Sequence, residues 1–551
     1  MAWIDEANKH VNEPGAVFEL DLDSGTRKYS IEIIRPTDAP IIKGTILRLP
    51  VVSNSIGGIL RTLEFSTITI ELDDTDYEFR TVVGPDGEGL KNREARIKIP
   101  FINISLAGFA KTVFVGRVSN ATPLPGLRFQ IVCEQNSKNL TNRYPDKTVE
   151  AGDYGNLPSG ISGTLIKEPY GPISDFGGAN KGAWLPIMVD DTVGAEIHLV
   201  GRQTAAITVD RVYFNDVIQT EGAGNDYQIG TQVIDGHTHT EIQWEATGPN
   251  PTIEDVVRCD IGFGTREVCE MWKHYLENFC GYINADFDAV SYAAANVIGV
   301  TRGYIAKGAF REQKELVSHR DDLCREFELE IWWEPKDGLV HFNYFTSSVT
   351  PTIHYYDYKD ILEGYVPKND MTLIVNSQRV GYNWDYGSEL FRNYATRENV
   401  PSQTKHGATY KGEFKGLYFV RDSSVANDLA ARVILLRKDP IALEEFPLPI
   451  KGMDIDLSDV LQITHFDGKG AAGYEGTTFQ VRKTTYNLDK FIAKLGLLDY
   501  SNFIGSSFIL GPQALLDFTF ETAANKAKYG FVVDPATGDQ SDGTEGKKLS
   551  D

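Results

Sequence analysis

Short runs of β-branched and aromatic residues recur towards both ends of the chain, and they constrain its fold more than any other feature. In the first 140 residues they occupy positions 66–72, 95–99, 112–116 and 127–133. Several runs alternate apolar with polar side chains, as a strand does when only one of its faces is buried. Turn-forming residues at 23–25 and 84–89 lie among them. The first part of the chain is therefore predicted to form an antiparallel barrel or sandwich.

The length and charge of the chain limit the classes of protein to which it can belong. At 551 residues it has room for roughly three to five domains, each with its own core. Its 54 basic and 77 acidic side chains give a net charge of −23. This charge argues against general binding to duplex DNA, because such binding needs Lys and Arg to neutralise phosphates. A hydrophobic fraction of 41% is too high for a disordered chain.

Membrane insertion, secretion and disulfide bonding are not expected. No run approaches the roughly 20 apolar residues of a membrane span, and the first residues lack the basic and apolar regions of a signal peptide. The number of cysteines is odd and no two form a CxxC pair, so buried free thiols are predicted. They are Cys133, Cys259, Cys269, Cys280 and Cys324. The sequence thus predicts a soluble, acidic, multi-domain protein made in a cytoplasm.

The central part of the chain is predicted to contain a small β-module followed by an α+β region. A stretch rich in Gly and Pro after residue 151 indicates a long irregular connection. Strands are then expected at 197–200, 206–209, 212–214 and 240–244. Next, Thr265 can cap a helix that ends near Phe279, and a second helix is expected over 311–327. This helix leads into a hairpin over 328–345.

From about residue 370 the chain returns to β-structure. Strands are expected at 373–375, 379–383, 416–419, 457–464, 478–482 and 493–498. One helix interrupts them over 424–438, with Asp422 or Ser423 as its cap and Val425 and Leu429 on its buried face. The last 20 residues have almost no apolar side chains. They are expected to form a mobile tail or a segment that orders only on a partner.

The sequence contains no strong signal of catalysis. It has no GxxxxGK[ST] or GxGxxG phosphate-binding loop, no GxSxG nucleophile elbow and no HExxH zinc-peptidase helix. The 77 acidic residues always offer some carboxylate pair, so the availability of a pair does not indicate a glycoside hydrolase. We therefore expect no enzymatic activity and no cofactor.

Two local patterns remain as candidates for ligand binding. His237, His239 and Glu241 would share one face of a strand, where two imidazoles and a carboxylate can bind Zn²⁺ or Ni²⁺. The alternative, a polar loop leading into an exposed strand face, needs no metal, and no metal site is predicted. Trp332 and Trp333 could stack on sugar rings. Adjacent strand residues face opposite ways, however, so one of the two is expected in the core.

Four groups of residues resemble, in this order, parts of the tail hub proteins of siphophages. They are 93–100 with 111–118; 182–187 with 210–216; 321–338; and 430–436 with 446–449, 457–461, 463–465 and 479–481. The first group resembles the opening β-domain of the family, the second a β-module between hub domains, and the third a helix followed by a hairpin. The fourth is the strongest match and resembles the closing barrel, although Ser458 stands where the family usually has Gly. Together they cover most of residues 15–503.

The resemblance implies a mainly β fold with an α+β middle region and two tail-tube-like β-barrels in one chain. Three chains would then present six barrels and join a sixfold tube to a threefold tip. The expected domains are a first hub barrel (1–148), a small inserted β-domain (149–252), an α+β domain (253–365), a second hub barrel (366–503) and a partly flexible C-terminal extension (504–551). The two β-regions inferred from the residues alone, about 15–145 and 370–503, agree with this plan.

The function implied by the resemblance is that of a structural virion protein, the central hub of the tail tip or baseplate. A homotrimer would form the channel for ejection of tape-measure protein and DNA, and would contact distal tail or tube proteins and central fibre or receptor-binding proteins. DNA would pass without specific binding, so acidic side chains are expected on the barrel faces that line the bore. The alternatives are a carbohydrate- or receptor-binding β protein at the same tip, or a tip-associated cell-wall hydrolase.

Overall fold

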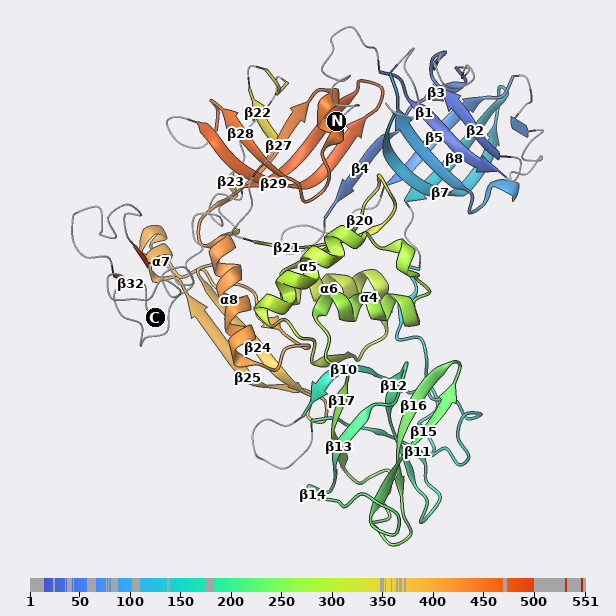
Figure 1. Cartoon of the computed structure of the whole chain (residues 1–551), viewed down its shortest axis with the longest axis vertical. Helices are drawn as coiled ribbons and strands as arrows, with labels where there is room; N and C mark the ends of the chain where they lie inside the picture. The colour runs from blue at the N-terminus through green and yellow to red at the C-terminus, as the bar shows by residue number, and fades with distance from the viewer. Residues whose placement is uncertain are drawn as a thin grey trace.

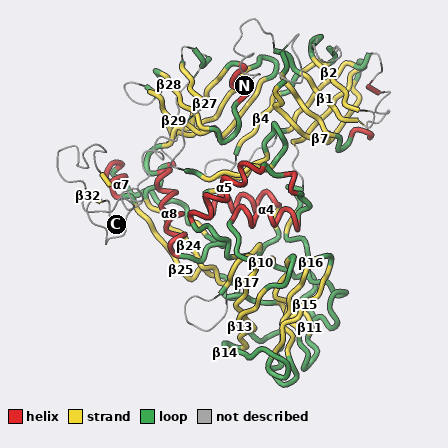
Figure 2. Tube along the Cα trace, in the orientation of Figure 1, coloured by secondary structure: helices red, strands yellow, loops and turns green. Residues whose placement is uncertain are grey.

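The computed structural model has two large curved β-sheets side by side at one end, a helical layer at the centre and a smaller β-module at the other end (Figure 1). Apart from a few isolated positions, it describes residues 14–22, 25–34, 44–56, 66–75, 88–101, 110–135, 139–174, 183–346, 353–357, 359–362, 373–468 and 473–499. The chain is mainly β with an α+β centre, as the sequence predicted. The helices gather in the middle of the molecule, between the large sheets and the β-module (Figure 2).

The first large sheet is antiparallel, with the strand order β2-β1-β6-β7-β8-β5-β3. Its strands are β1 (Val17–Leu22), β2 (Gly25–Ser30), β3 (Ile46–Arg48), β5 (Thr67–Asp73), β6 (Glu94–Ile99), β7 (Lys111–Leu124) and β8 (Arg128–Gln135). Along β5, Ile68 and Ile70 are buried while Thr67 and Thr69 are exposed, which is the predicted alternation. The four strands predicted here correspond to β5–β8, and β1 to β3 were not predicted.

The second large sheet has the order β22-β28-β29-β30-β27-β23. Its strands are β22 (Ile353–Tyr356), β23 (Asn369–Asp370), β27 (Ile441–Leu448), β28 (Val460–His465), β29 (Tyr474–Asn487) and β30 (Ile492–Asp499). Strands β22 and β28 are parallel, and the other neighbours are antiparallel. The strands predicted at 457–464, 478–482 and 493–498 correspond to β28, β29 and β30, and β29 is much longer than predicted.

Strand β4 (Val51–Ser55) joins the two large sheets. It lies within the first β-region of the sequence but pairs antiparallel with residues 483–487 of β29. On the same edge of β29, residues 474–480 pair with β28, so the extra length of β29 is used to hold β4. The two sheets are therefore connected by a ladder of backbone hydrogen bonds as well as by packing.

The small β-module consists of a five-stranded and a four-stranded sheet, in the orders β14-β13-β17-β10-β18 and β11-β12-β16-β15. Their strands are β10 (Glu168–Ile173), β11 (Ile187–Asp190), β12 (Ile197–Gln203), β13 (Thr208–Phe214), β14 (Val217–Ile218), β15 (Tyr227–Ile234), β16 (His237–Trp244), β17 (Val257–Phe263) and β18 (Gly308–Phe310). The strands predicted at 206–209 and 212–214 form one strand, β13. Strand β18 lies among the central helices in sequence, so the module and the helical layer share a sheet.

Three helices and a hairpin make up the centre. They are α4 (Val268–Phe279), α5 (Ala289–Arg302), α6 (Leu316–Phe327), β20 (Leu329–Trp333) and β21 (Val340–Tyr344). Helix α4 is capped by Glu267 and not by Thr265, since the Glu267 carboxylate accepts the N–H of Cys269 at 2.6 Å. Helix α6 begins later than predicted because the residues before it form β19 (Lys314–Glu315), which pairs with β9 (Arg143–Tyr144). Helix α5 was not predicted.

Helix α8 (Ser423–Arg437) packs on the sheet formed by β24 (Ser377–Asp385), β25 (Leu390–Glu398) and β26 (Lys415–Gly416), and the short helix α7 (Val400–His406) follows β25. The predicted bounds and buried face of α8 are confirmed: Val425 and Leu429 are buried. Asp422 is at its N-cap position without a side-chain capping bond, and its carboxylate accepts from Lys307 at 2.6 Å instead. Residues 373–375 form no strand. The remaining elements are η1 (Glu88–Leu90), η2 (Asn284–Asp286), η4 (Ile450–Asp454), β31 (Phe531–Val532) and β32 (Lys547–Lys548).

Two large hydrophobic cores stabilise the molecule. The two large sheets share one of them, in which Val52 and Ile56 lie with Phe114 and Phe479. The other joins the helical centre to the small β-module and to the sheet beneath α8. All five cysteines are buried free thiols, as predicted. Within the described ranges, no helix has the length and apolar content needed to cross a membrane.

Some sequence predictions fall outside the described residues. They concern most of the turns at 23–25 and 84–89, the start of the motif at 182–187, and the tail after residue 499 apart from β31 and β32.

Candidate functional site

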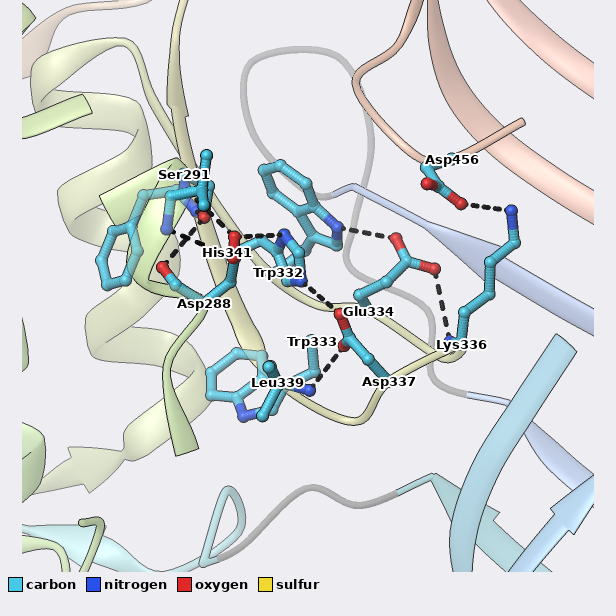
Figure 3. Close-up of polar contacts among 12 residues, drawn as sticks. Asp288, Ser291, Trp332, Trp333, Glu334, Lys336, Asp337, Leu339, His341 and Asp456 are labelled. Carbon is cyan, nitrogen blue, oxygen red and sulfur yellow. Dashed lines mark hydrogen bonds and ion pairs between the residues drawn. The ribbon is translucent and has the colours of Figure 1, made fainter. Parts of the chain in front are cut away.

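The turn of the β20–β21 hairpin is the point at which three parts of the chain meet (Figure 3). From the first sheet, the Val115 N–H donates to the carbonyl of Pro335 at 2.6 Å. From β4, the Asn54 amide donates to the carbonyl of Trp333 at 3.2 Å. Towards the second sheet, the Lys336 ammonium donates to the carbonyl of Ile455 at 2.5 Å. The hairpin therefore fixes the helical centre to both large sheets, and we take this junction as the candidate site.

The two adjacent tryptophans of β20 belong to two different cores. Trp332 is 4% exposed and lies in the core shared by the large sheets, while Trp333 is 1% exposed and lies in the central core. The Trp332 indole also donates to the Glu334 carboxylate at 3.1 Å. The sequence predicted that one of the rings is buried, and the structure buries both. Neither ring presents a face on which a sugar could stack.

Lys336 is a buried cation that projects from the turn towards the second sheet. It forms an ion pair with Asp456, and its backbone N–H donates to Glu334 at 3.4 Å. Burial opposes its charge, but Tyr486, Asp456 and Glu334 outweigh this effect and raise the pKa of Lys336. Burial also raises the pKa of Glu334, to about 7, although Lys336 acts in the opposite direction. The cluster holds one charged lysine between two acids inside the joint.

A second polar cluster connects the hairpin to the start of α5. The His341 ring lies 2.9 Å from Asp337 and 3.8 Å from Asp288, and it stacks on Trp332 with ring centroids 5.4 Å apart. Burial lowers the pKa of His341, but the hydrogen bond to Asp337 and the negative charges of Asp337, Glu334 and Asp288 together outweigh it, so the net shift is upward. Asp288 caps α5 by accepting the Ser291 N–H at 3.1 Å. The hairpin therefore also fixes the N-terminus of α5.

The third cluster surrounds Glu330, which is 1% exposed on β20. Arg482 of β29 forms an ion pair with it, and Asn343 and Gln480 donate to the same carboxylate at 3.0 and 3.1 Å. The Ser458 hydroxyl donates to it as well, at 3.1 Å. Ser458 has a φ of 71°, a left-handed conformation that favours Gly. Ser458 therefore adopts the turn conformation at a position where hub proteins usually have Gly. Its hydroxyl also donates a hydrogen bond to the buried Glu330 carboxylate.

An open cleft of about 650 Å³ lies between α5, the hairpin and the two large sheets. Its charged lining residues are Lys111, Asp288, Glu334, Lys336, Asp337, His341, Asp456 and Asp459. Most of these groups engage one another in the ion pairs above. Among the residues that the structure describes, no group of three or more His, Cys, Asp or Glu side chains could hold a metal ion. The ion pairs that line the cleft connect the hairpin to α5 and to Asp456, shortly before β28.

The three metal-site candidates lie far along the chain from this cleft, on β16. His239 is fully buried and accepts from or donates to the Tyr154 hydroxyl at 3.0 Å, and burial lowers its pKa to about 4. Both ring nitrogens of His237 lie 3.1 Å from backbone carbonyl oxygens. Glu241 accepts from Gln232 at 2.6 Å. Each candidate is thus held by partners within the protein.

Sequence reasoning missed the charged residues of the joint. Glu330, Glu334 and Lys336 belong to the predicted hairpin, for which the sequence placed only one of the two tryptophans in a core. In the structure every residue of β20 is buried, because one face packs on the helices and the other on the large sheets. Alternation within one strand carries no information about a second covering layer.

The acidic excess of the chain lies outside the two large β-regions. Residues 1–148 contain 19 acidic and 18 basic side chains, and residues 366–503 contain 17 of each. Residues 149–365, by contrast, contain 34 acidic and 15 basic side chains. Neither barrel region therefore has a marked net acidic excess, and the placement of their acidic side chains on faces that line a bore stays a prediction. The charge belongs to the small β-module and the helical centre.

Comparison with known proteins identifies similar folds but no sequence family. No protein-family model matches the chain, and no curated protein matches it. Prophage tail protein gp18 from Listeria monocytogenes EGD-e is 8% identical, with a TM-score of 0.38 over 88% of this chain and 94% of that chain. A chain of the native gene transfer agent virion is 11% identical, with a TM-score of 0.38 over 66% of this chain and 91% of that chain.

The 43 kDa tail protein of prophage MuSo2 from Shewanella oneidensis is 7% identical, with a TM-score of 0.36 over 89% of this chain and 99% of that chain. These similar structures are two prophage tail proteins and a chain of a gene transfer agent virion. Their TM-scores are all below 0.5.

Proposed function

We propose that the chain is a structural protein of a phage tail and, within the tail, the central hub of the tip or baseplate. The observation that carries the proposal is the joining of two large β-sheets in one chain by β4 and by a common core. A hub that carries two tube-like barrels must hold them in a fixed relative orientation, because both have to meet the same ring of tube subunits. A shared strand and a shared core meet that requirement.

In this proposal three copies present six barrels to a sixfold tube, and the helical centre and small β-module form the body of the tip. The β20–β21 joint transmits load between the two parts, because its buried ion pairs connect the helical centre to both sheets. Partners would be tube or distal-tail proteins at the barrels, and tape-measure protein and DNA in the channel. The domain boundaries expected from the sequence are part of the same proposal.

The two rival functions gain no support from the residues at the joint. A carbohydrate-binding protein needs exposed aromatic faces, whereas Trp332 and Trp333 are buried. A wall hydrolase needs a pair of carboxyl groups facing a substrate, whereas Glu330 and Glu334 are engaged by Arg482 and by Trp332 inside the joint. We therefore propose a role without catalysis.

Multi-angle light scattering tests the hub function. The full-length chain is measured alone and after mixing with the tail-tube protein of the same virion, because a hub can trimerise only during assembly. We expect the mass of three copies, at least in the mixture. A strict monomer that also fails to bind tube protein would contradict the proposal. A glycan array and cell-wall zymography serve as controls, and a clear signal in either would favour the corresponding rival.

A further inference from the structure

Helix α5 carries an exposed apolar face, which borders the open cleft at Val290 and Ala294. Val290, Val297 and Val300 are 79%, 65% and 57% exposed, and the two alanines at 293 and 294 between them are exposed as well. The opposite face packs on β21 and α4 through buried Ala295 and Gly299. Three exposed valines in line on one helix differ from the single exposed apolar residues that any surface carries.

The same face is free of charge in a strongly acidic part of the molecule. Residues 289–301 contain no charged side chain, whereas residues 253–365 as a whole contain 20 acidic and 11 basic ones. Two copies of a chain with a net charge of −23 repel each other wherever acidic surfaces meet. The α5 face is a place where a second copy can approach without that repulsion. Its charge pattern therefore favours a copy of this chain over a basic partner.

The spacing of the exposed residues suits helix-to-helix packing. Positions 290, 293, 297 and 300 follow each other in steps of three, four and three, the spacing of the a and d positions of a coiled coil. Valine stands at both a-type positions. At about 1.5 Å per residue the 14-residue helix is about 21 Å long, which gives two heptads of contact. A seam this short is weak in isolation, but α5 is held in place by Asp288 and by the hairpin joint.

We propose that α5 is the contact between copies of this chain, with the Val290, Val297 and Val300 faces of neighbouring copies packed against one another. The number of copies, three, rests on the proposed hub function, whereas the choice of a second copy rests on the α5 face itself. Three α5 helices around a threefold axis form a parallel seam without an open centre. Such a seam closes the channel at the level of the helical layer until the tip rearranges.

Disulfide trapping tests the contact in the full-length protein. Val297→Cys introduces an exposed thiol into a chain whose own five cysteines are buried. Cysteines can bond only when their Cα atoms are within about 7 Å, so mild oxidation reports close approach of two α5 helices. The matched control is Val233→Cys, at a valine that is 72% exposed on β15 of the small β-module. We expect a covalent dimer with Val297→Cys and none with Val233→Cys, at least in the mixture with tube protein.

Replacing the same valines by glutamate tests the α5 contact independently of the hub function. Val297→Glu is expected to raise the concentration needed for half-maximal self-association at least tenfold, while Val233→Glu leaves it unchanged. If the wild type and Val297→Glu form equal trimers and Val297→Cys gives no covalent dimer, the α5 contact is refuted and the hub function stands. If no variant and no mixture shows any self-association, both are refuted. Circular dichroism spectra identical to wild type show that Val297→Glu is folded.

Discussion

Replacing Arg482 by methionine removes the cation that compensates Glu330 inside the joint between β20 and β29. Methionine keeps an unbranched apolar stem of similar length, so the substitution removes charge with little loss of packing. Arg482 and Glu330 are both buried, and their ion pair connects the hairpin to the second large sheet. The variant therefore tests whether the pair holds the joint together.

The expected cost follows from the surroundings of the carboxylate. Removing one partner of a buried ion pair costs about 3–5 kcal/mol, because the other charge stays buried without compensation. Glu330 keeps three neutral donors, from Asn343, Gln480 and Ser458, which places the expected cost at the lower end, about 3 kcal/mol. The double variant Glu330→Gln/Arg482→Met buries no charge at this point. It should recover about half of the loss or more, because a buried pair can often be replaced at little cost.

Hydrogen exchange measured by mass spectrometry suits this test, because the chain has several cores and global unfolding need not be two-state. The readout is the opening free energy of the backbone amides in β20 and β29. The control is Arg128→Met, which removes a 3.5 Å pair with Glu71 at a side chain that is 45% exposed, and which should cost about 0–1 kcal/mol. If Arg482→Met opens the joint no more than Arg128→Met does, or if the double variant is no more stable than the single one, the compensation argument is wrong.

Three further predictions concern the same region and the thiols. Ser458 has a left-handed φ of 71° and donates to Glu330, so stability in urea should fall in the order wild type, Ser458→Gly, Ser458→Ala, with Ala about 1 kcal/mol below Gly. Glu326 is a buried residue of α6, and burial raises its pKa to about 8. The protonated carboxyl therefore contributes its full stabilisation below about pH 4.5, and this contribution is lost as the pH rises to 8. Urea unfolding of Glu326→Gln should accordingly show a gain over wild type that grows across that range, and a constant difference would contradict the pKa. Finally, Ellman's reagent should react with no thiol in the native protein and with five after unfolding.

The sequence predicted well those elements whose pattern is local. The apolar stripe of α8 identified its buried residues, including Val425 and Leu429, because a helix on a sheet buries one continuous stripe. Strands β5 and β6 were found for a similar reason, since one face of their sheet packs on a core and the other faces solvent. In these cases the environment of each residue follows from its own segment.

The sequence failed where the environment of a segment depends on a distant one. Strand β4 pairs with β29, which lies more than 400 positions further along the chain. The sequence of its five residues does not identify that partner. Helix α5 has apolar side chains on its inner and outer faces, so it lacks the polar stripe by which a surface helix is recognised. Glu330 is acidic on a strand that is buried on both faces, and only the approach of Arg482 from the second sheet makes this possible.

The distribution of charge changes what the hub hypothesis has to explain. Charges on the first large sheet are largely paired, since Glu19 contacts Lys28 at 3.3 Å and Lys98 at 2.8 Å, and Asp21 contacts Arg96 at 2.8 Å. Repulsion of DNA by a net acidic barrel is therefore a poor account of the −23. The excess lies in residues 149–365, where it opposes contact between copies everywhere except at uncharged faces. The acidic charge of residues 149–365 would then prevent copies from meeting at most of their surfaces. The valine face of α5 remains as a contact that causes no like-charge repulsion.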